Sequence, residues 1–236
     1  MKIYGKNAIR EALKKNHKME KIIFCENVKD EEIYNLAKKS GLNPEIMKKA
    51  TFQKNFGDKT GGVVAIATDY EYTPLDKVLA KADKLEECVI LLLDGLEDPH
   101  NLGAILRSCD ATGVLAVVLP KNRSVHLSDT VAKVSTGAIE HVDCALVTNL
   151  NQTMETLKEH GFWVIGLELS GTIDYRDADY KGKCAIVVGS EGKGIAPLVQ
   201  KNCDLLVKIP MYGEVNSLNA SVSAGIILYE AIRHRR

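Results

Sequence analysis

Five short segments in this 236-residue chain are apolar almost throughout, without the alternation expected of a half-exposed strand. They are residues 88–93, 114–119, 162–167, 184–188 and 204–209. Strands of this kind are buried on both faces, which is typical of a parallel sheet covered by helices. Helix-like segments alternate with them, at 102–111, 129–139, 150–160, 196–201 and 217–233. The pattern predicts a doubly wound, parallel-sheet α/β domain over residues 88–236.

The first 70 residues predict a second, smaller α/β domain. Two helices and two strands are expected there, at 7–15, 30–40, 21–25 and 62–68. Asp30 stands at the N-cap position of the second helix, and Gly41 follows its end. A charged stretch, residues 71–87, contains Pro74 and is interpreted as a linker with a connecting helix at 75–82. The expected division is therefore 1–70, 71–87 and 88–236.

The formal net charge of the whole chain is zero, but the charge is unevenly distributed. Residues 1–60 carry 14 Lys and Arg against 8 Asp and Glu. This local basic excess is compatible with RNA binding but does not establish it. No apolar run reaches membrane-spanning length, and the N-terminal residues lack the apolar core of a signal peptide. We therefore expect a soluble protein located in the cytoplasm.

The six cysteines are widely spaced along the chain: Cys25, Cys88, Cys109, Cys144, Cys184 and Cys203. No two of them form a C-x-x-C pair, and none lies near a histidine at metal-binding spacing. Several fall in apolar segments, where a free thiol behaves as a small hydrophobic group. We expect reduced, buried cysteines and no metal site.

Three polar loops each follow an apolar strand and lead into a helix. They span residues 94–101, 189–194 and 209–217. The first carries Asn101, with Arg107 on the following helix, and the second places three glycines around Glu191. The third opens into a helix expected to begin with small residues: Ser217, Asn219, Ser221 and Ser223. Because ligands of parallel α/β sheets bind beyond the carboxyl ends of the strands, we expect one shared site.

Each loop also has a purely structural interpretation. Asn101 could cap its helix while Arg107 is solvated, and the glycine loop could be a turn that leaves Glu191 in water. The small residues of the last helix could pack against a neighbouring helix or a second subunit. A nucleotide-dependent oxidoreductase is a rival function, but the glycine spacing at 189–194 is not that of a dinucleotide-binding loop.

Taken together, the motifs resemble those of the SpoU (TrmH-type) RNA ribose 2′-O-methyltransferases of the SPOUT superfamily. The matching segments are Asp-Pro-His-Asn-Leu-Gly-Ala-Ile-Leu-Arg (98–107), Val-Gly-Ser-Glu-Gly-Lys-Gly (188–194), Ile-Pro-Met (209–211) and Ser-Leu-Asn-Ala-Ser (217–221). Residues 4–13 also resemble the start of the family's small, L30e-like substrate-binding domain. One departure is Lys-Thr-Gly-Gly (59–62), where relatives often carry His-Gln-Gly. The resemblance is greatest to bacterial enzymes that methylate a guanosine ribose of 23S rRNA.

The resemblance implies a deep trefoil knot, a homodimer and S-adenosylmethionine as the methyl donor. The donor would be held largely by backbone groups of three residues: Gly189, Ile209 and Leu218. Arg107 would activate the 2′-hydroxyl, with four residues positioning it or shaping the site: Asn101, Glu191, Ser217 and Asn219. RNA would be gripped by Arg10, Lys14 and Lys15 of the first domain.

Two accounts of Arg107 remain open. A deprotonated guanidinium could remove the hydroxyl proton, or a charged one could stabilise the developing alkoxide and hold a phosphate. We favour the charged form, because a guanidinium gives up its proton only above a pH of about 12. Two alternative functions also remain, a tRNA methyltransferase and a relative that binds RNA without catalysis.

Overall fold

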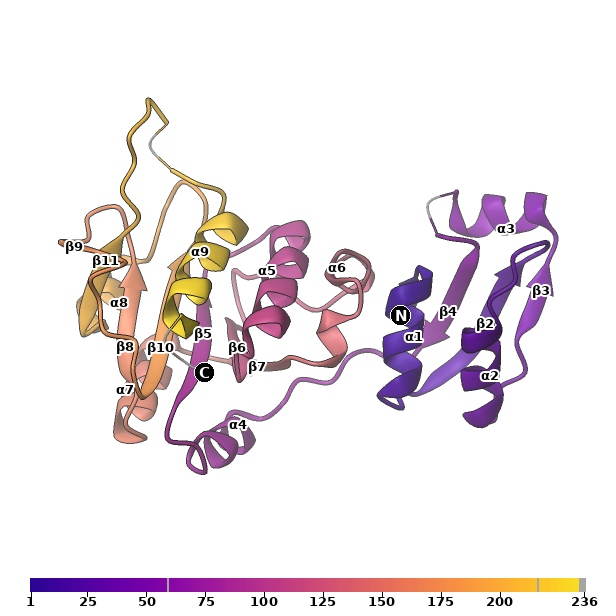
Figure 1. Cartoon of the computed structure of the whole chain (residues 1–236), viewed down its shortest axis with the longest axis horizontal. Coiled ribbons are helices and arrows are strands. Elements are labelled where there is room, and N and C mark those ends of the chain that lie inside the picture. Colours follow the sequence, from indigo (N-terminus) through magenta and orange to yellow (C-terminus); the bar gives the residue numbers. More distant parts are fainter. Residues whose placement is uncertain (59, 216, 234–236) are drawn as a thin grey trace. The chain divides into compact units, whose positions relative to one another are not determined.

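The computed structural model describes residues 1–58, 60–215 and 217–233, so Lys59 of the 59–62 departure and Asn216 of the third loop lie outside it. The chain folds into two compact units (Figure 1). Unit 1 contains Met1–Glu71 together with Leu127–His141, and unit 2 contains Tyr72–His126 and Val142–Arg236. The sequence division places residues 127–141 in the larger domain, whereas their contacts place them in unit 1.

Unit 1 is built on a four-stranded mixed sheet with the order β1-β4-β2-β3. Strand β4 is antiparallel to β1 and β2, and β2 is parallel to β3. Its elements are β1 (Lys2–Tyr4), α1 (Lys6–Lys14), β2 (Met19–Cys25), α2 (Glu31–Lys39), β3 (Glu45–Met47), α3 (Lys49–Phe56), β4 (Val63–Ala67), α6 (Asp129–Ser135) and a 3-10 turn (Ala138–Glu140). The Asp30 side chain accepts a hydrogen bond from the Ile33 amide at 3.1 Å, which confirms it as the N-cap of α2.

Sequence reasoning missed β1, β3 and α3. The two strands have only three residues each, too few to show a period. Helix α3 buries a single side chain, Phe52, so its sequence carries no apolar stripe. The helix expected at 129–139 is present, but as the shorter α6 followed by the 3-10 turn.

A buried polar network joins the two segments of unit 1. The ring of His17 lies 3.3 Å from a carboxylate oxygen of Glu140 through Nδ1 and 3.0 Å from the carbonyl oxygen of Thr68 through Nε2. Both partners only accept, so both ring nitrogens carry a proton when both bonds form. Tyr70 donates its hydroxyl hydrogen to the other oxygen of Glu140. The carboxylate therefore holds Leu127–His141 against Met1–Glu71.

The hydrogen bond to Glu140 raises the pKa of His17, although burial opposes the shift. A folded-state pKa above the unfolded value of about 6.5 means that protonation stabilises the fold at low pH. This stabilisation is complete below the unfolded pKa and is lost as pH rises through the folded pKa. Burial, with the nearby Glu140 charge, raises the pKa of Tyr70 so that this phenol stays protonated.

We predict that the stability advantage of wild type over His17→Gln is larger at pH 6 than at pH 9. Urea unfolding followed through the amide NMR signals of unit 1 measures it, because the single tryptophan, Trp163, reports only on unit 2. His126→Gln is the matched control, since the His126 ring belongs to unit 2, where it lies 3.1 Å from the Lys121 carbonyl oxygen and packs edge-on against the Tyr72 ring. A difference that stays constant between the two pH values would contradict the charged His17 network.

Unit 2 contains a seven-stranded sheet with the order β7-β6-β5-β10-β8-β11-β9, and every neighbouring pair is parallel. The strands are β5 (Cys88–Asp94), β6 (Ala116–Pro120), β7 (Asp143–Val147), β8 (Trp163–Leu167), β9 (Ile173–Asp174), β10 (Lys183–Gly189) and β11 (Leu205–Lys208). The helices are α4 (Leu75–Ala82), α5 (Pro99–Thr112), α7 (Leu150–Glu159), α8 (Pro197–Asn202) and α9 (Ala220–Ile232). The predicted parallel α/β fold is confirmed.

Three details of unit 2 differ from the sequence-based expectation. Strands β7 and β9 were missed: β7 begins with an aspartate and β9 has two residues. Helix α9 begins at Ala220, and Ser217 lies in the loop before it. Trp163 lies in the segment 162–167, which the sequence predicts to be buried on both faces, but it is 51% exposed because it is the first residue of β8.

The six cysteines are free, and all but Cys203 are buried. Burial raises the pKa of Cys144 to about 12, so this thiol is protonated and unreactive at neutral pH. Among the described helices, none combines the length and the apolar character needed to cross a membrane.

Candidate active site

The three polar loops meet at the carboxyl edge of the sheet in unit 2. Strands β5 and β10 are neighbours, and their last residues, Asp94 and Gly189, are in register. The loops that leave them therefore start side by side. The third loop follows β11 and returns to the same edge at the start of α9, which packs along α5.

Glu191 connects all three loops through one carboxylate oxygen. Its Oε1 accepts hydrogen bonds from Asn101 Nδ2 at 2.9 Å, from the Ala220 amide at 3.2 Å and from Asn219 Nδ2. Asn219 Nδ2 also lies 2.9 Å from Asn101 Oδ1. The structure thus brings together Asn101, Glu191 and Asn219, which are widely separated in the sequence. Glu191 is exposed, as its interpretation as a turn residue requires, but its carboxylate is also hydrogen-bonded to both neighbouring loops.

Asn101 and Asn219 have different local roles. Asn219 is the N-cap of α9, because its Oδ1 accepts from the amides of Ser221 at 2.9 Å and Val222 at 3.4 Å. Asn101 is not a cap, since Asp98 caps α5 by accepting from the His100 amide. Instead, the Asn101 side chain is buried, and its amide group is hydrogen-bonded to Glu191 and Asn219.

Arg107 lies six residues after Asn101 on α5, and its side chain is exposed. The adjacent Ser108 faces α9, where a Cβ built on Gly225 would lie 3.6 Å from the serine Oγ. Within the described residues, no hydrogen bond or ion pair links Arg107 to Glu191. The guanidinium therefore keeps its donors available for a partner outside the chain.

A cavity of about 310 Å³, the first cavity, lies between the second and third loops. Its lining includes Gly189, Ile209 and Leu218, the three residues expected to hold the methyl donor, and also Ser217. A Cβ added at Gly189 would lie 2.1 Å from the carbonyl carbon of Gly194, so only glycine allows the loop to close in this way. The lining combines glycines and apolar side chains with polar ones, of which Glu168, Glu191 and Lys193 are charged.

Sequence reasoning missed Glu168, which holds the glycine loop from the other side. It follows β8, and its Oε2 accepts from the Ile195 amide at 2.9 Å while Oε1 accepts from the Leu169 amide at 3.0 Å. Gly194 has a φ of +64°, and a Cβ there would lie 2.4 Å from Glu168 Oε2. The signal was available, because Glu168 follows an apolar strand just as Asp94 does.

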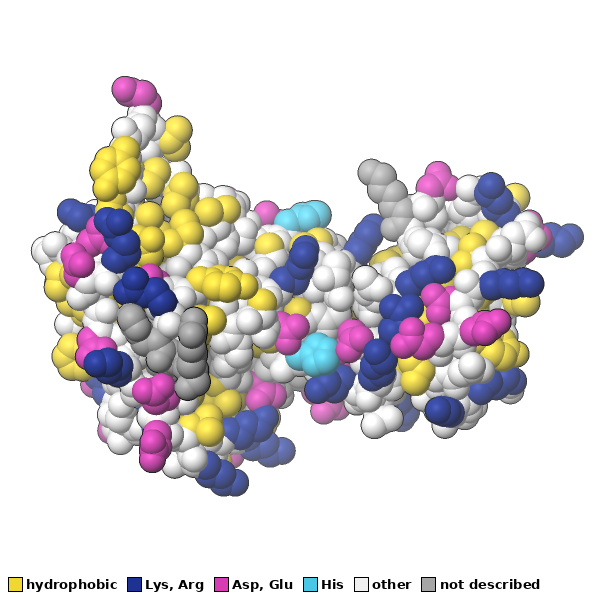
Figure 2. Space-filling model, in the orientation of Figure 1, with side chains coloured by type: hydrophobic (Ala, Val, Ile, Leu, Met, Phe, Trp, Pro, Cys, Tyr) yellow, Lys and Arg dark blue, Asp and Glu magenta, His cyan; other side chains and the backbone are white. Residues whose placement is uncertain are grey.

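The basic residues expected to grip RNA lie on α1 in unit 1. Arg10 pairs with Glu32 at 2.6 Å and with Asp30 at 3.5 Å, and Lys14 lies 3.5 Å from Glu32. Their charge is thus partly offset by neighbouring acids, whereas Lys15 is exposed at the end of the helix. Figure 2 shows basic and acidic side chains intermixed over this unit. No group of three or more His, Cys, Asp or Glu among the described residues is arranged to hold a metal ion.

Two family models together match most of the chain. The SpoU rRNA methylase family matches residues 88–229, and the RNA 2′-O ribose methyltransferase substrate-binding domain matches residues 2–73. The chain belongs to the SpoU family. A Bacillus subtilis (strain 168) protein, YacO, named as a member of the TrmH family of tRNA/rRNA methyltransferases, is 46% identical to it over 99% of this chain and 95% of its own length. The predicted family membership is confirmed.

Solved structures share the whole fold of this SpoU-family chain. An RNA 2′-O ribose methyltransferase matches it with a TM-score of 0.81 and 29% identity, covering 100% of this chain and 88% of that one. An rRNA methyltransferase from Sinorhizobium meliloti with AdoMet bound has a TM-score of 0.83 at 24% identity, covering 100% and 87%. At that identity, the second match establishes the fold alone.

We predict that Glu168→Ala weakens S-adenosylmethionine binding by about tenfold or more, which corresponds to about 1.4 kcal/mol. The substitution removes the acceptor that holds the Ile195 amide and so loosens the loop that lines the first cavity. Isothermal titration calorimetry measures the affinity, and hydrogen exchange at the Ile195 amide reports on the loop. Glu168→Gln, which keeps an acceptor oxygen, should restore most of the binding. Unchanged affinity in Glu168→Ala would contradict this positioning role.

Proposed function

We propose that this chain transfers a methyl group from S-adenosylmethionine to a ribose 2′-hydroxyl of RNA, with a guanosine of 23S rRNA as the target. The observation that carries the proposal is the meeting of the three SpoU motif loops at Glu191, beside the first cavity. Membership of a family of RNA 2′-O ribose methyltransferases supports the reaction. A tRNA target is the alternative, because the name of the Bacillus relative covers both RNAs.

The first cavity suits the methyl donor. Glycine backbone at one wall can meet the polar edge of an adenine, and Ile209 and Leu218 supply apolar surface for its faces. When bound, S-adenosylmethionine supplies the methyl group on a positively charged sulfur. The loops of Gly189, Ile209 and Leu218 hold it, and Ser217 lines the same cavity.

Arg107 acts on the RNA side of the reaction. Its exposed guanidinium stays charged, stabilises the alkoxide that develops on the 2′-oxygen and holds a neighbouring phosphate. Asn101 and Asn219 are fixed by Glu191, so they offer a rigid polar wall to the ribose. Much of the rate acceleration then comes from positioning the hydroxyl in line with the methyl group.

RNA binding at unit 1 would involve Arg10, Lys14 and Lys15, with an affinity that falls as salt rises. The carboxylates beside Arg10 and Lys14 make the contribution of these two residues to RNA affinity smaller than that of the exposed Lys15.

The trefoil knot of the family and a cytoplasmic location remain predictions. The alternative that the protein binds RNA without catalysis is less well supported. A non-catalytic relative would be expected to have lost some of the motif residues, and all four are present: Asn101, Arg107, Glu191 and Asn219.

The proposal predicts tritium transfer from labelled S-adenosylmethionine to total rRNA, but not to total tRNA, prepared from a strain lacking the gene. The transferred methyl group should block the 2′-hydroxyl of one ribose and so make the adjacent phosphodiester bond resistant to alkaline cleavage. Arg107→Ala should lower the rate by about 100-fold or more while S-adenosylmethionine still binds, since one charge-stabilising donor contributes about that much. Arg107→Lys keeps the charge and should retain more activity than Arg107→Ala.

Three results would count against the proposal in different ways. Label in tRNA alone would keep the chemistry and overturn the rRNA target. No label in either RNA, with the donor still bound, would favour a non-catalytic RNA binder. Loss of donor binding in Arg107→Ala would contradict the role assigned to the guanidinium.

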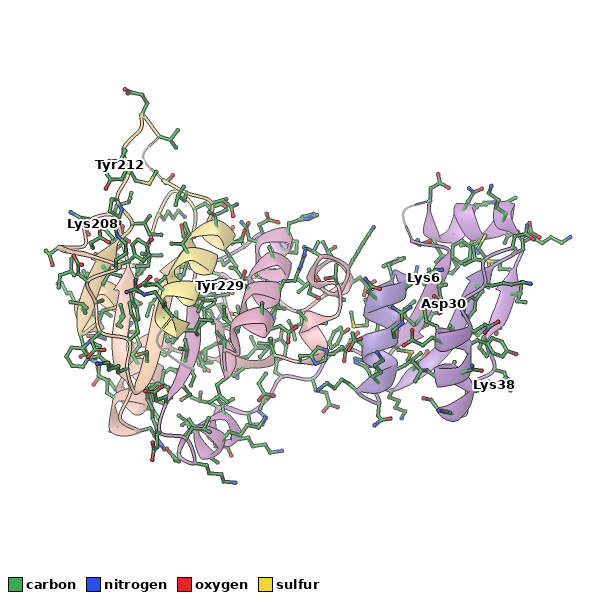
Figure 3. All side chains as sticks on the ribbon, viewed as in Figure 1. Lys6, Asp30, Lys38, Lys208, Tyr212 and Tyr229 are labelled. Carbon is green, nitrogen blue, oxygen red and sulfur yellow. The ribbon has the colours of Figure 1, made fainter. Side chains whose placement is uncertain are left out.

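We further propose that the protein is a homodimer through an exposed apolar face of α9. The small residues of this helix pack inside the chain: Ala224 is fully buried, and Gly225 faces Ser108 of α5. The exposed face instead carries Val222 (48% exposed) and Tyr229 (55% exposed), two helical turns apart. Figure 2 shows hydrophobic side chains gathered over α9 and the loop before it, and Figure 3 labels Tyr229 on the helix.

Light scattering should give a mass of twice the 25.9 kDa of one chain. The double variant Val222→Glu/Tyr229→Glu should shift the protein to monomer, because two charges would be buried in the interface. Ile46→Glu, at a residue 76% exposed in unit 1, is the control and should stay dimeric. A wild-type protein that is monomeric and active would contradict the dimer.

A further inference from the structure

A second, larger cavity in unit 2 adjoins the first at the glycine loop. Its volume is about 710 Å³. Four residues of the loop line both cavities: Ser190, Glu191, Lys193 and Gly194. Asn101, which Glu191 holds, lines only the second cavity. The two cavities therefore share the loop that carries the proposed catalytic network.

A group transfer requires its two substrates to meet across the catalytic residues. The first cavity has the lining expected for the methyl donor, which leaves the second for the base of the methyl acceptor. The acceptor's ribose must then lie outside it, because Arg107 lines neither cavity. Its volume falls within the range of about 300–1,000 Å³ that is usual for small-molecule sites, large enough for a nucleotide. Its floor is formed where β5, β6 and β7 end, at Asp94, Pro120 and Thr148.

Some polar groups in the second cavity are already engaged. Asp94 accepts from the Ala196 amide at 2.7 Å, Asp98 caps α5, and Asn149 caps α7 by accepting from the Asn151 amide at 2.9 Å. Three charged side chains of the lining, Glu97, Arg123 and Lys193, make no hydrogen bond or ion pair within the described residues. They are free to bind a ligand.

The backbone of Arg123 supports a binding role. It has a φ of 54°, in the left-handed region that residues with a side chain rarely adopt, as Asn16, Asn27 and Thr136 also do elsewhere in the chain. Such strain is concentrated at functional sites, because the surrounding structure must compensate for it. Here it accompanies a guanidinium on the lining of a cavity next to the proposed reaction centre.

We propose that the second cavity binds the guanine base of the target nucleotide, with Arg123 and Glu97 reading its two edges. Guanine presents two acceptors, O6 and N7, which match the paired donors of a guanidinium. It also presents two donors, N1–H and the 2-amino group, which match a carboxylate. Adenine lacks both of these edges, and cytosine and uracil each lack at least one. This inference rests on the proposed methyl transfer to a guanosine of RNA and names the residues that select the base.

The binding test uses the full chain saturated with S-adenosylhomocysteine and followed by amide NMR. Guanosine 5′-monophosphate should shift the signals of the second cavity, at residues 95–98, 122–123 and 148–151, and adenosine 5′-monophosphate should shift them at least about fivefold less. Arg123→Ala and Glu97→Gln should each remove the preference for guanine. Lys121→Ala and Glu86→Gln, at exposed residues outside both cavities, are the matched controls.

The kinetic test uses the RNA that accepts label in the tritium assay. Arg123→Ala should raise the KM for RNA by about tenfold or more, with unchanged affinity for S-adenosylmethionine. Shifts confined to unit 1, equal shifts with both nucleotides, no shift with either, or an unchanged KM in Arg123→Ala would each overturn the proposal. Failure of the methyl-transfer function itself would be seen separately, as absence of label or of donor binding in wild type.

Discussion

One carboxylate oxygen holds the site of this protein together. Oε1 of Glu191 accepts three hydrogen bonds, from two side-chain amides and one backbone amide, and the donors come from loops about 90 and 30 residues away. Hydrogen bonds to a charged acceptor are worth about 1.5–3 kcal/mol each when buried, and less at the exposed Glu191, so the junction fixes the relative positions of loops that the sheet already orders. Without it, the loops would share an edge of the sheet but not a fixed geometry.

The topology makes this junction possible. Strand β10 inserts between β5 and β8, although the chain passes through β6, β7 and β8 before reaching it. The loops after β5, β8 and β10 therefore emerge side by side, and Glu168 after β8 supports the glycine loop from the side opposite β5. The glycine loop also lines both cavities. A methyl donor and an acceptor can then approach the same residues from two directions.

Much of this was predictable from the sequence. Continuous apolar segments predicted the parallel sheet because burial on both faces leaves no alternation, and the motif loops predicted the shared site. Tertiary contacts could not be predicted in this way. The sequence placed residues 127–141 in the larger domain, whereas hydrogen bonds from His17 and Tyr70 to Glu140 hold this segment in unit 1. The exposure of Trp163 and the start of α9 at Ala220 both depend on the exact residue at which a strand or helix begins. Apolar patterns define such boundaries poorly.

The most direct test of the account compares Glu191→Gln with Glu191→Ala for S-adenosylmethionine affinity by isothermal titration calorimetry. A glutamine oxygen can accept the same three hydrogen bonds, whereas alanine leaves Asn101, Asn219 and the Ala220 amide without their common acceptor. We expect near wild-type affinity for Glu191→Gln and a loss of about tenfold or more, or about 1.4 kcal/mol, for Glu191→Ala. Wild-type affinity in Glu191→Ala would show that the three loops hold their geometry without this junction and would contradict the account.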